Sequence, residues 1–184
     1  ADRDVFRRLW SIATTGAGRR REVALSSAAA VLRDNAFPAL ETAARLPEAP
    51  LRAAAAESLA YLTFPKAAPL RAKLASDPDP LVRGAVLAGL RTAEAVAQNR
   101  ALAQAALNDA DAGVRAAAVE ALARWGDASL IPVLADTLAK AAPMREPDVS
   151  IAVIGAAEKL RAEAGAQELV ETAYRNPNPV VARL

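Results

Sequence analysis

One segment recurs at a fixed spacing along this 184-residue chain, and the repeat constrains the fold more than any other feature. SDPDPLVRGAVLAGL at 76–90 aligns without a gap with NDADAGVRAAAVEAL at 108–122, so that Arg83 corresponds to Arg115. One repeat earlier, PEAPLRAAAAESL places Arg52 in the same phase as Arg83. A fixed period of about 30 residues predicts a solenoid, in which each repeat buries its apolar face against its neighbours.

The repeated segment also carries a family resemblance. DPDPLVR at 77–83 resembles the HEAT-repeat signature at the entry to the second helix of a unit. The HEAT family places a proline in the first helix, and Pro38, Pro69 and Pro132 stand at that phase of this chain. The resemblance, which extends to bilin-lyase-type HEAT arrays, covers nearly the whole chain. It implies an all-α, right-handed α–α superhelix of the HEAT/armadillo-like solenoid class.

Hydrophobic periodicity and turn residues place the expected helices along the chain. We expect about five helix pairs plus a partial sixth, with Asn35 capping the third helix through its side chain. The connection 141–147 is longer than the others, because Val114 and Val149 stand further apart in sequence than the equivalent residues of earlier repeats. The expected helices are 4–13, 19–32, 35–46, 50–62, 64–75, 81–92, 95–107, 113–125, 129–138 and 164–174, with one more starting near 148.

The final unit lacks most of its second helix. The turn at 77–82 recurs at 176–181, and the sequence then ends at Leu184. A solenoid end without a capping repeat exposes apolar surface. We therefore expect a single HEAT-like repeat domain over 1–184 that is an excerpt of a longer chain.

The composition excludes several kinds of chemistry. Apolar residues make up 53% of the chain and are mostly alanine, which favours closely packed helices. The chain has neither cysteine nor histidine, so thiolate nucleophiles, the commonest general base and the commonest metal ligand are missing. The paired acids Asp77/Asp79 and Asp109/Asp111 recur in phase with the repeat and therefore belong to the scaffold. We expect no catalytic residue, no metal site, no cofactor and no enzymatic activity.

Positive charge is concentrated at the N-terminal end. The net charge is only +2, but residues 1–33 contain seven arginines against three acids. Arg19, Arg20 and Arg21 follow a glycine-containing loop and form a candidate anion-binding cluster. The alternative is a solvated helix start, because a basic run by itself rarely specifies nucleic acid.

Acids and arginines recur together at the start of each second helix. In each pair the acid stands where it can accept backbone N–H groups, and the arginine follows one turn later at i+4. We expect a structural ladder of caps and ion pairs between neighbouring repeats, and the alternative is an anion-binding row of arginines. The members of this ladder are Arg52, Asp79, Arg83, Asp111 and Arg115, with Glu48 before Arg52.

In the solenoid that the resemblance implies, the second helices line the concave side. Once the buried stripe of each second helix is subtracted, the remaining positions are smooth, mildly apolar and sparsely charged. Such a face fits a helix or an extended segment of another protein better than a polyphosphate. The alternative is ordinary alanine-rich helix surface without a ligand. The predicted partner-binding residues are Glu57, Tyr61, Leu87, Arg91, Val119, Glu120 and Arg124.

These features favour a non-catalytic scaffold that binds a protein segment or a neighbouring domain on its concave face. One alternative is nucleic-acid binding, as in the HEAT-like DNA glycosylases, although the bare inner face opposes it. Another is an accessory repeat domain of a larger enzyme, such as a bacterial peptidyl-prolyl isomerase or bilin lyase with a HEAT array. No apolar run is long enough to span a bilayer, so we expect no membrane partner and favour a soluble, cytoplasmic protein.

Overall fold

The structure is a computed structural model that describes residues 2–16, 19–144, 146–160 and 165–174. Every regular element in these ranges is a helix, and none of the described residues lies in a strand. The predicted all-α, HEAT-like solenoid class is therefore confirmed. The contacts divide the chain into two compact units, Ala1–Leu90 (unit 1) and Arg91–Leu184 (unit 2).

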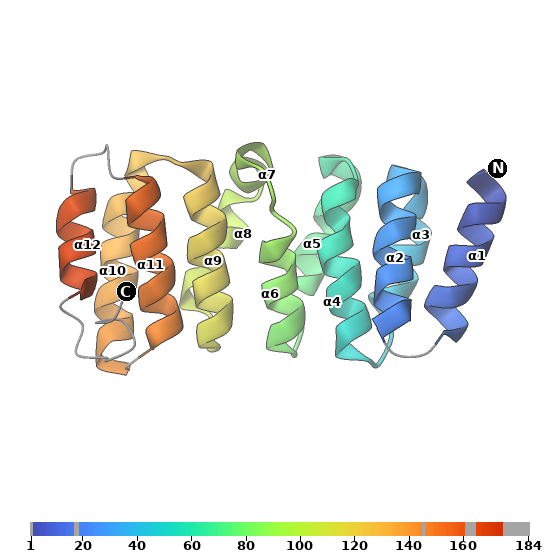
Figure 1. Cartoon of the computed structure of the whole chain (residues 1–184), viewed down its shortest axis with the longest axis horizontal. Coiled ribbons are helices and arrows are strands. Elements are labelled where there is room, and N and C mark those ends of the chain that lie inside the picture. The colour runs from blue at the N-terminus through green and yellow to red at the C-terminus, as the bar shows by residue number, and fades with distance from the viewer. Residues whose placement is uncertain (1, 17–18, 145, 161–164, 175–184) are drawn as a thin grey trace. The chain divides into compact units, whose positions relative to one another are not determined.

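In unit 1 the second helices of successive repeats, α2, α4 and α6, form the inner row. α2 contacts α4, α4 contacts α6, and α1 packs against α2. The first helices α3 and α5 lie behind this row in Figure 1. The elements are α1 (Asp2–Thr15), α2 (Arg19–Leu32), the 3-10 helix η1 (Arg33–Ala36), α3 (Phe37–Ala43), α4 (Ala49–Ser58), η2 (Leu59–Tyr61), α5 (Phe64–Leu74) and α6 (Pro80–Ala88).

Unit 2 repeats the arrangement with α9 and α11 side by side as its inner row. α7 and α8 pack against α9, α10 packs against α11, and α12 contacts both α10 and α11 (Figure 1). The elements are α7 (Ala93–Gln98), α8 (Arg100–Ala105), η3 (Ala106–Asn108), α9 (Ala112–Trp125), η4 (Ala128–Leu130), α10 (Ile131–Met144), α11 (Pro147–Lys159) and α12 (Ala166–Tyr174).

Gly89 marks a close approach of α4 and α6 in unit 1. A Cβ at this position would lie 3.2 Å from the Glu57 carbonyl oxygen and 3.3 Å from that of Ala56. These contacts are tighter than ordinary van der Waals distances, so the missing side chain lets the two backbones come together. The equivalent position in α9, one repeat later, is the fully buried Ala121, so the unit 2 inner row accommodates a methyl group there.

The predicted helix 95–107 is wrong, because the chain forms α7 and α8 with a break at Asn99. The backbone of Asn99 leaves the helical region, with φ −117° and ψ 21°. Its side-chain amide donates to the Ala95 carbonyl oxygen at 2.7 Å, and its own N–H donates to Val96 instead. A short polar side chain that takes the i−4 carbonyl competes with the helical hydrogen bond, and this competition ends α7.

The predicted long connection 141–147 is mostly helix. α10 continues to Met144 where the hydrophobic pattern predicted an end at 138, and α11 starts at Pro147. The additional residues of this repeat therefore lengthen a first helix and do not form an extended loop. Alanine, the strongest helix former, dominates this stretch, which accounts for the continuation.

The predicted capping role of Asn35 is also wrong. The chain enters α3 through η1, so helical geometry begins before Phe37, and the N-cap residue Ala36 has no side-chain hydrogen bond to offer. The neighbouring Asp34 instead accepts hydrogen bonds from the Thr63 N–H at 2.8 Å and hydroxyl at 2.7 Å, which ties η1 to the start of α5. The recurrent turn predicted at 176–181 lies outside the described residues.

Candidate interaction surface

The unit 1 inner row presents an exposed face whose positions recur once in each repeat. Val23 is 57% exposed and Leu81 is 54% exposed, so this face carries uncovered aliphatic side chains. On α4, which lies between α2 and α6, the corresponding positions are Pro50 and Ala54, and both have small side chains. We call this set the unit 1 face: Arg19, Val23 and Ala30 on α2; Pro50, Ala54 and Glu57 on α4; Tyr61 on η2; and Leu81, Ala85 and Ala88 on α6.

The predicted contact residues Leu87 and Val119 are wrong, because both side chains are buried, with exposed fractions of 1% and 0%. Ala56 occupies the same phase of the repeat and is also fully buried. Each inner helix is covered by neighbouring inner helices as well as by the first-helix layer, so the solvent-exposed strip is narrower than a one-sided amphipathic helix suggests. The exposed position lies one residue later, at Ala88 and Glu120.

The other predicted contact residues are at least partly accessible. Arg91 and Glu120 are exposed, while Glu57, Tyr61 and Arg124 are half-buried. The Tyr61 ring lies 6.0 Å from the Arg33 guanidinium carbon, a cation–π distance. The unit 2 inner row differs in chemistry from the unit 1 face, because its accessible positions include Glu120 and Arg124 on α9 together with the exposed acids of α11, Asp148 and Glu158.

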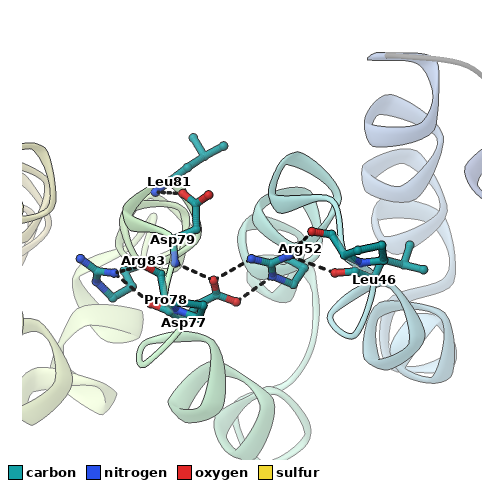
Figure 2. Close-up of polar contacts among 8 residues, drawn as sticks. Leu46, Arg52, Asp77, Pro78, Asp79, Leu81 and Arg83 are labelled. Atoms are coloured by element: carbon teal, nitrogen blue, oxygen red, sulfur yellow. Dashed lines mark hydrogen bonds and ion pairs between the residues drawn. The ribbon is translucent and has the colours of Figure 1, made fainter.

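Arg52 joins two neighbouring repeats in unit 1, and Figure 2 shows its contacts. Its guanidinium donates to both carboxylate oxygens of Asp77 at 2.8 and 2.9 Å. It also donates to the carbonyl oxygens of Leu46 at 3.0 Å and Pro47 at 2.7 Å in the turn before its own helix. The hydrogen bond from Arg52 lowers the pKa of the Asp77 carboxyl below its usual value. We call this arrangement, in which an arginine binds both the turn before its own helix and an acid of the next repeat, a rung.

Arg83, the next arginine of the expected ladder, also binds the turn before its own helix. Arg83 donates to the carbonyl oxygens of Asp77 at 2.9 Å and Pro78 at 3.1 Å. Asp79 serves as an N-cap, because its carboxylate accepts the Leu81 N–H at 2.9 Å (Figure 2). The acid at i therefore caps the helix, and the arginine at i+4 reaches the preceding turn.

Unit 2 also contains a rung. Arg115 donates to the Asp109 carbonyl oxygen and to the Glu146 carboxylate in the turn of the next repeat. Asp111 caps α9 by accepting the Val114 N–H at 3.0 Å. Glu146 binds Arg115 through Oε1, while its buried Oε2 has no hydrogen-bond partner in the part of the chain that the structure describes.

Arg21 belongs to the same series, although the sequence pattern placed it in an anion-binding cluster. Its guanidinium donates to Glu48 Oε1 at 2.9 Å and to the Ala13 carbonyl oxygen at 3.0 Å. The hydrogen bond from Arg21 lowers the pKa of Glu48. Arg21 stands one repeat before Arg52. This spacing was the sequence signal for its pairing with an acid of the next repeat, and the prediction did not take it into account. Arg19 and Arg20 remain exposed, so the three arginines do not act as one cluster.

Trp125 has a structural neighbour over its ring. The Arg100 guanidinium lies 4.3 Å from the ring centroid, and the ring is half-buried at the end of α9. Gly126 follows with φ 73°, the left-handed conformation that commonly ends a helix. A base that stacked on this ring would have to displace Arg100.

Two cavities occur near the rungs. The first, of about 90 Å³, is mainly apolar and lies in unit 1. The second, of about 200 Å³, lies in unit 2 beside the Arg115–Glu146 pair. No group of three or more metal-binding side chains forms within the described ranges. The first cavity is lined by Trp10, Ala13, Arg21, Leu25, Thr42, Ala43, Leu46 and Leu51, and the second by Leu107, Asn108, Asp109, Arg115, Thr137, Lys140, Ala141 and Glu146.

Comparison with known families matches residues 99–184 to the model of HEAT repeats. A comparison with curated proteins found no match. Within the described residues, none of the helices combines the length and the apolarity needed to cross a membrane. HEAT repeats generally mediate protein interactions. The matched segment, together with the helix pairs of both units, supports the resemblance of this chain to the HEAT-repeat family.

Proposed function

We propose that this chain is a non-catalytic scaffold that binds a segment of a partner protein on the exposed side of its inner helices. The observation that carries this proposal is the unit 1 face, where Val23 and Leu81 are each more than half exposed. Burying apolar surface contributes about 25 cal/mol per Å², so a partner that covers both side chains gains binding free energy. Scattered single aliphatic residues are normal on a surface, but these two share one face with only small side chains between them.

A binding role without chemistry is supported by what the acids of the described residues do. Asp79 and Asp111 cap helices, and Asp77 and Glu146 bind the arginines of rungs. A catalytic acid or base must be accessible to a substrate and hold a tuned pKa. The most regular acids of this chain are instead occupied by backbone N–H groups and guanidinium groups.

Nucleic-acid binding is the second candidate, and the exposed arginines of α1 and α2 favour it. Phosphate contacts give an affinity that falls steeply with salt. A labelled DNA duplex titrated at two salt concentrations therefore tests this candidate. Strong, salt-sensitive binding that does not need Leu81 would favour it over the protein scaffold.

The scaffold proposal is tested with a display library of helical and extended peptides selected on the whole chain. The variants Val23→Lys and Leu81→Lys place a charge where the apolar contact is proposed. Ala72→Lys is the matched control, because it adds the same charge at an exposed position of α5, outside the inner row. We expect the selected peptides to lose most of their affinity for the first two variants and to keep it for the control. Peptides that bind all three variants equally would refute the proposed surface.

A further inference from the structure

We propose that the segment bound by the unit 1 face is an acidic amphipathic helix, whose carboxylates contact Arg19 and Arg20 while its apolar side covers Val23 and Leu81. This inference rests on the proposed function and specifies the chemistry of the partner. The competing ligand of the same region is a nucleic acid, and the experiment below distinguishes the two.

The first step concerns which cations of unit 1 are available. Arg21, Arg45 and Arg52 are each paired with a carboxylate, and Arg83 is bound to turn carbonyls. Arg7, Arg8, Arg19 and Arg20 are exposed, and none of them makes a hydrogen bond or an ion pair with a described residue. These four arginines lie on the first two helices, and Arg33, which is also exposed, lies over the Tyr61 ring.

The second step concerns how charge and apolar surface alternate on α2. Arg19 and Arg20 stand at i−4 and i−3 from Val23, so both cations lie within about one turn of its side chain. Val23 is 57% exposed, and Leu81 on the same unit 1 face is 54% exposed. A phosphate backbone offers no apolar group to cover these side chains, whereas an amphipathic helix offers aliphatic and acidic side chains together. This combination favours a peptide over a nucleic acid.

The third step concerns charge complementarity. Residues 1–90 carry 13 Lys and Arg against nine Asp and Glu, a net charge of +4, whereas residues 91–184 carry ten against 12, a net charge of −2. The single acid of α2, Glu22, is half-buried, while Arg19 and Arg20 are exposed. Carboxylates on a partner therefore meet a local excess of positive charge at the start of α2 and find none along the rest of the face.

The fourth step concerns the length of the bound helix. The positions of Arg19, Pro50 and Leu81 are equivalent in three successive inner helices. Packed helices lie about 10 Å apart, so the distance from α2 to α6 is about 20 Å. A helix rises about 1.5 Å per residue, and about 13 residues span that distance. The acidic side chains are expected at the α2 end of this segment and aliphatic side chains at the α6 end.

The experiment uses the peptides selected on the whole chain and measures affinity by fluorescence anisotropy. We expect these peptides to be rich in Glu or Asp at one end and in aliphatic residues spaced at i, i+3, i+4 and i+7. The double variant Arg19→Glu/Arg20→Glu should weaken binding about tenfold or more, because it turns two attractive contacts into repulsive ones. Lys73→Glu is the control, since it reverses an exposed charge on α5. It should change affinity less than twofold.

Each outcome has a separate meaning. If selected peptides need Leu81 but carry no acidic residues, or bind the double arginine variant normally, the acidic partner is refuted while the scaffold function stands. If no selected peptide depends on Val23 or Leu81, the proposed function fails and the inference fails with it. The natural chain could also bind a DNA duplex with a steep salt dependence. If the double variant no longer binds that duplex but retains its affinity for the peptides, the arginines bind nucleic acid and the acidic partner is again refuted.

Discussion

The turn before α6 and the turn before α11 both hold an arginine of the preceding inner helix, but they do so with different numbers of acids. Before α6, Asp77 binds Arg52 through both carboxylate oxygens and Asp79 caps the helix. Before α11, Glu146 stands at the N-cap position, binds Arg115 and makes no capping hydrogen bond through its side chain. At this turn the single acid binds the arginine, and the helix has no side-chain cap.

The turn before α4 follows the same rule. Glu48 occupies the N-cap position one repeat before Asp79, and it binds Arg21 without capping its own helix. The residue at the phase of Asp77 is Leu46, so this turn also has a single acid. Both single acids are glutamates, and the additional methylene extends the carboxylate from the N-cap position to the arginine. Where a turn has two aspartates, one caps the helix and the other binds the arginine. Where it has a single glutamate, that glutamate only binds the arginine.

The largest expected effect is the loss of the complete rung. Arg52→Ala leaves the Asp77 carboxylate, only 8% exposed, without its cation, and we expect a loss of about 3 kcal/mol in the free energy of unfolding of unit 1. Glu146→Ala should cost less, about 1 to 2 kcal/mol, because one of its oxygens already lacks a partner among the described residues. Urea unfolding of single-tryptophan variants measures both losses. The fluorescence of Trp10 reports on unit 1, and that of Trp125 reports on unit 2.

The control for this prediction is Arg45→Ala, which removes the exposed i, i+4 pair with Glu41 on α3. Exposed pairs contribute less than about 1 kcal/mol, so the urea midpoint should hardly move. Equal losses for Arg45→Ala and Arg52→Ala would contradict the distinction between rungs and surface ion pairs.

The next effect concerns whether the unit 1 rung spans an unusually close pair of helices. Gly89→Ala places a methyl group against the carbonyl oxygens of Glu57 and Ala56, and separating α4 from α6 should cost about 1 to 3 kcal/mol. Gly84→Ala is the matched control, because a Cβ there meets nothing within 4 Å and alanine favours helix by about 1 kcal/mol. Thermal unfolding should therefore shift in opposite directions for the two variants. A shift of the same sign would show that the close approach is not limiting.

A smaller effect isolates capping from pairing. Asp79→Ala removes the acceptor for the Leu81 N–H and should cost about 1 kcal/mol, whereas Asp79→Asn should retain most of the stability because asparagine also caps well. The measurement is again the urea midpoint of unit 1. If the alanine and asparagine variants are equally destabilised, the charge of Asp79 matters more than its hydrogen bond.

The smallest expected effect is the pH dependence of stability that arises from the Asp77–Arg52 pair. The hydrogen bond from Arg52 lowers the pKa of Asp77 in the folded chain, so the pair contributes fully above the unfolded pKa of about 3.9. This contribution is lost as the pH falls through the lower folded pKa. Stability measured from pH 6 to pH 2 should fall more steeply for the natural chain than for Asp77→Asn. Parallel curves would mean that Asp77 does not report on the rung.

Much of the fold followed from the sequence because its signals are local. The period of Arg52, Arg83 and Arg115 predicted stacked helix pairs, and the boundaries predicted for α2 agree at both ends. Asp79 and Asp111 were recognisable as caps because an N-cap needs only its own turn. The break at Asn99 was not evident, because asparagine inside an apolar pattern is common and only its bond to Ala95 ends the helix.

The candidate surface was harder to predict. An amphipathic pattern separates two sides of a helix, but it does not show that Leu87 and Val119 are buried, with exposed fractions of 1% and 0%. The partners of the arginines were equally hard to predict from the sequence. Arg52 binds an acid in the next repeat, although another acid stands nearer in sequence, at i−4. Choosing between two such acids requires knowing which turn the next repeat places beside the guanidinium.

The sequence by itself determined the repeat, the helical class and the residues that start each inner helix, because these depend on spacing and on backbone groups within one turn. The tertiary structure alone decided which acid completes each rung, which flank of each helix is covered, and which arginines remain exposed. These features depend on contacts between repeats. The energy of such a contact depends on the distance in space between side chains that are far apart in sequence, and only the folded structure sets that distance.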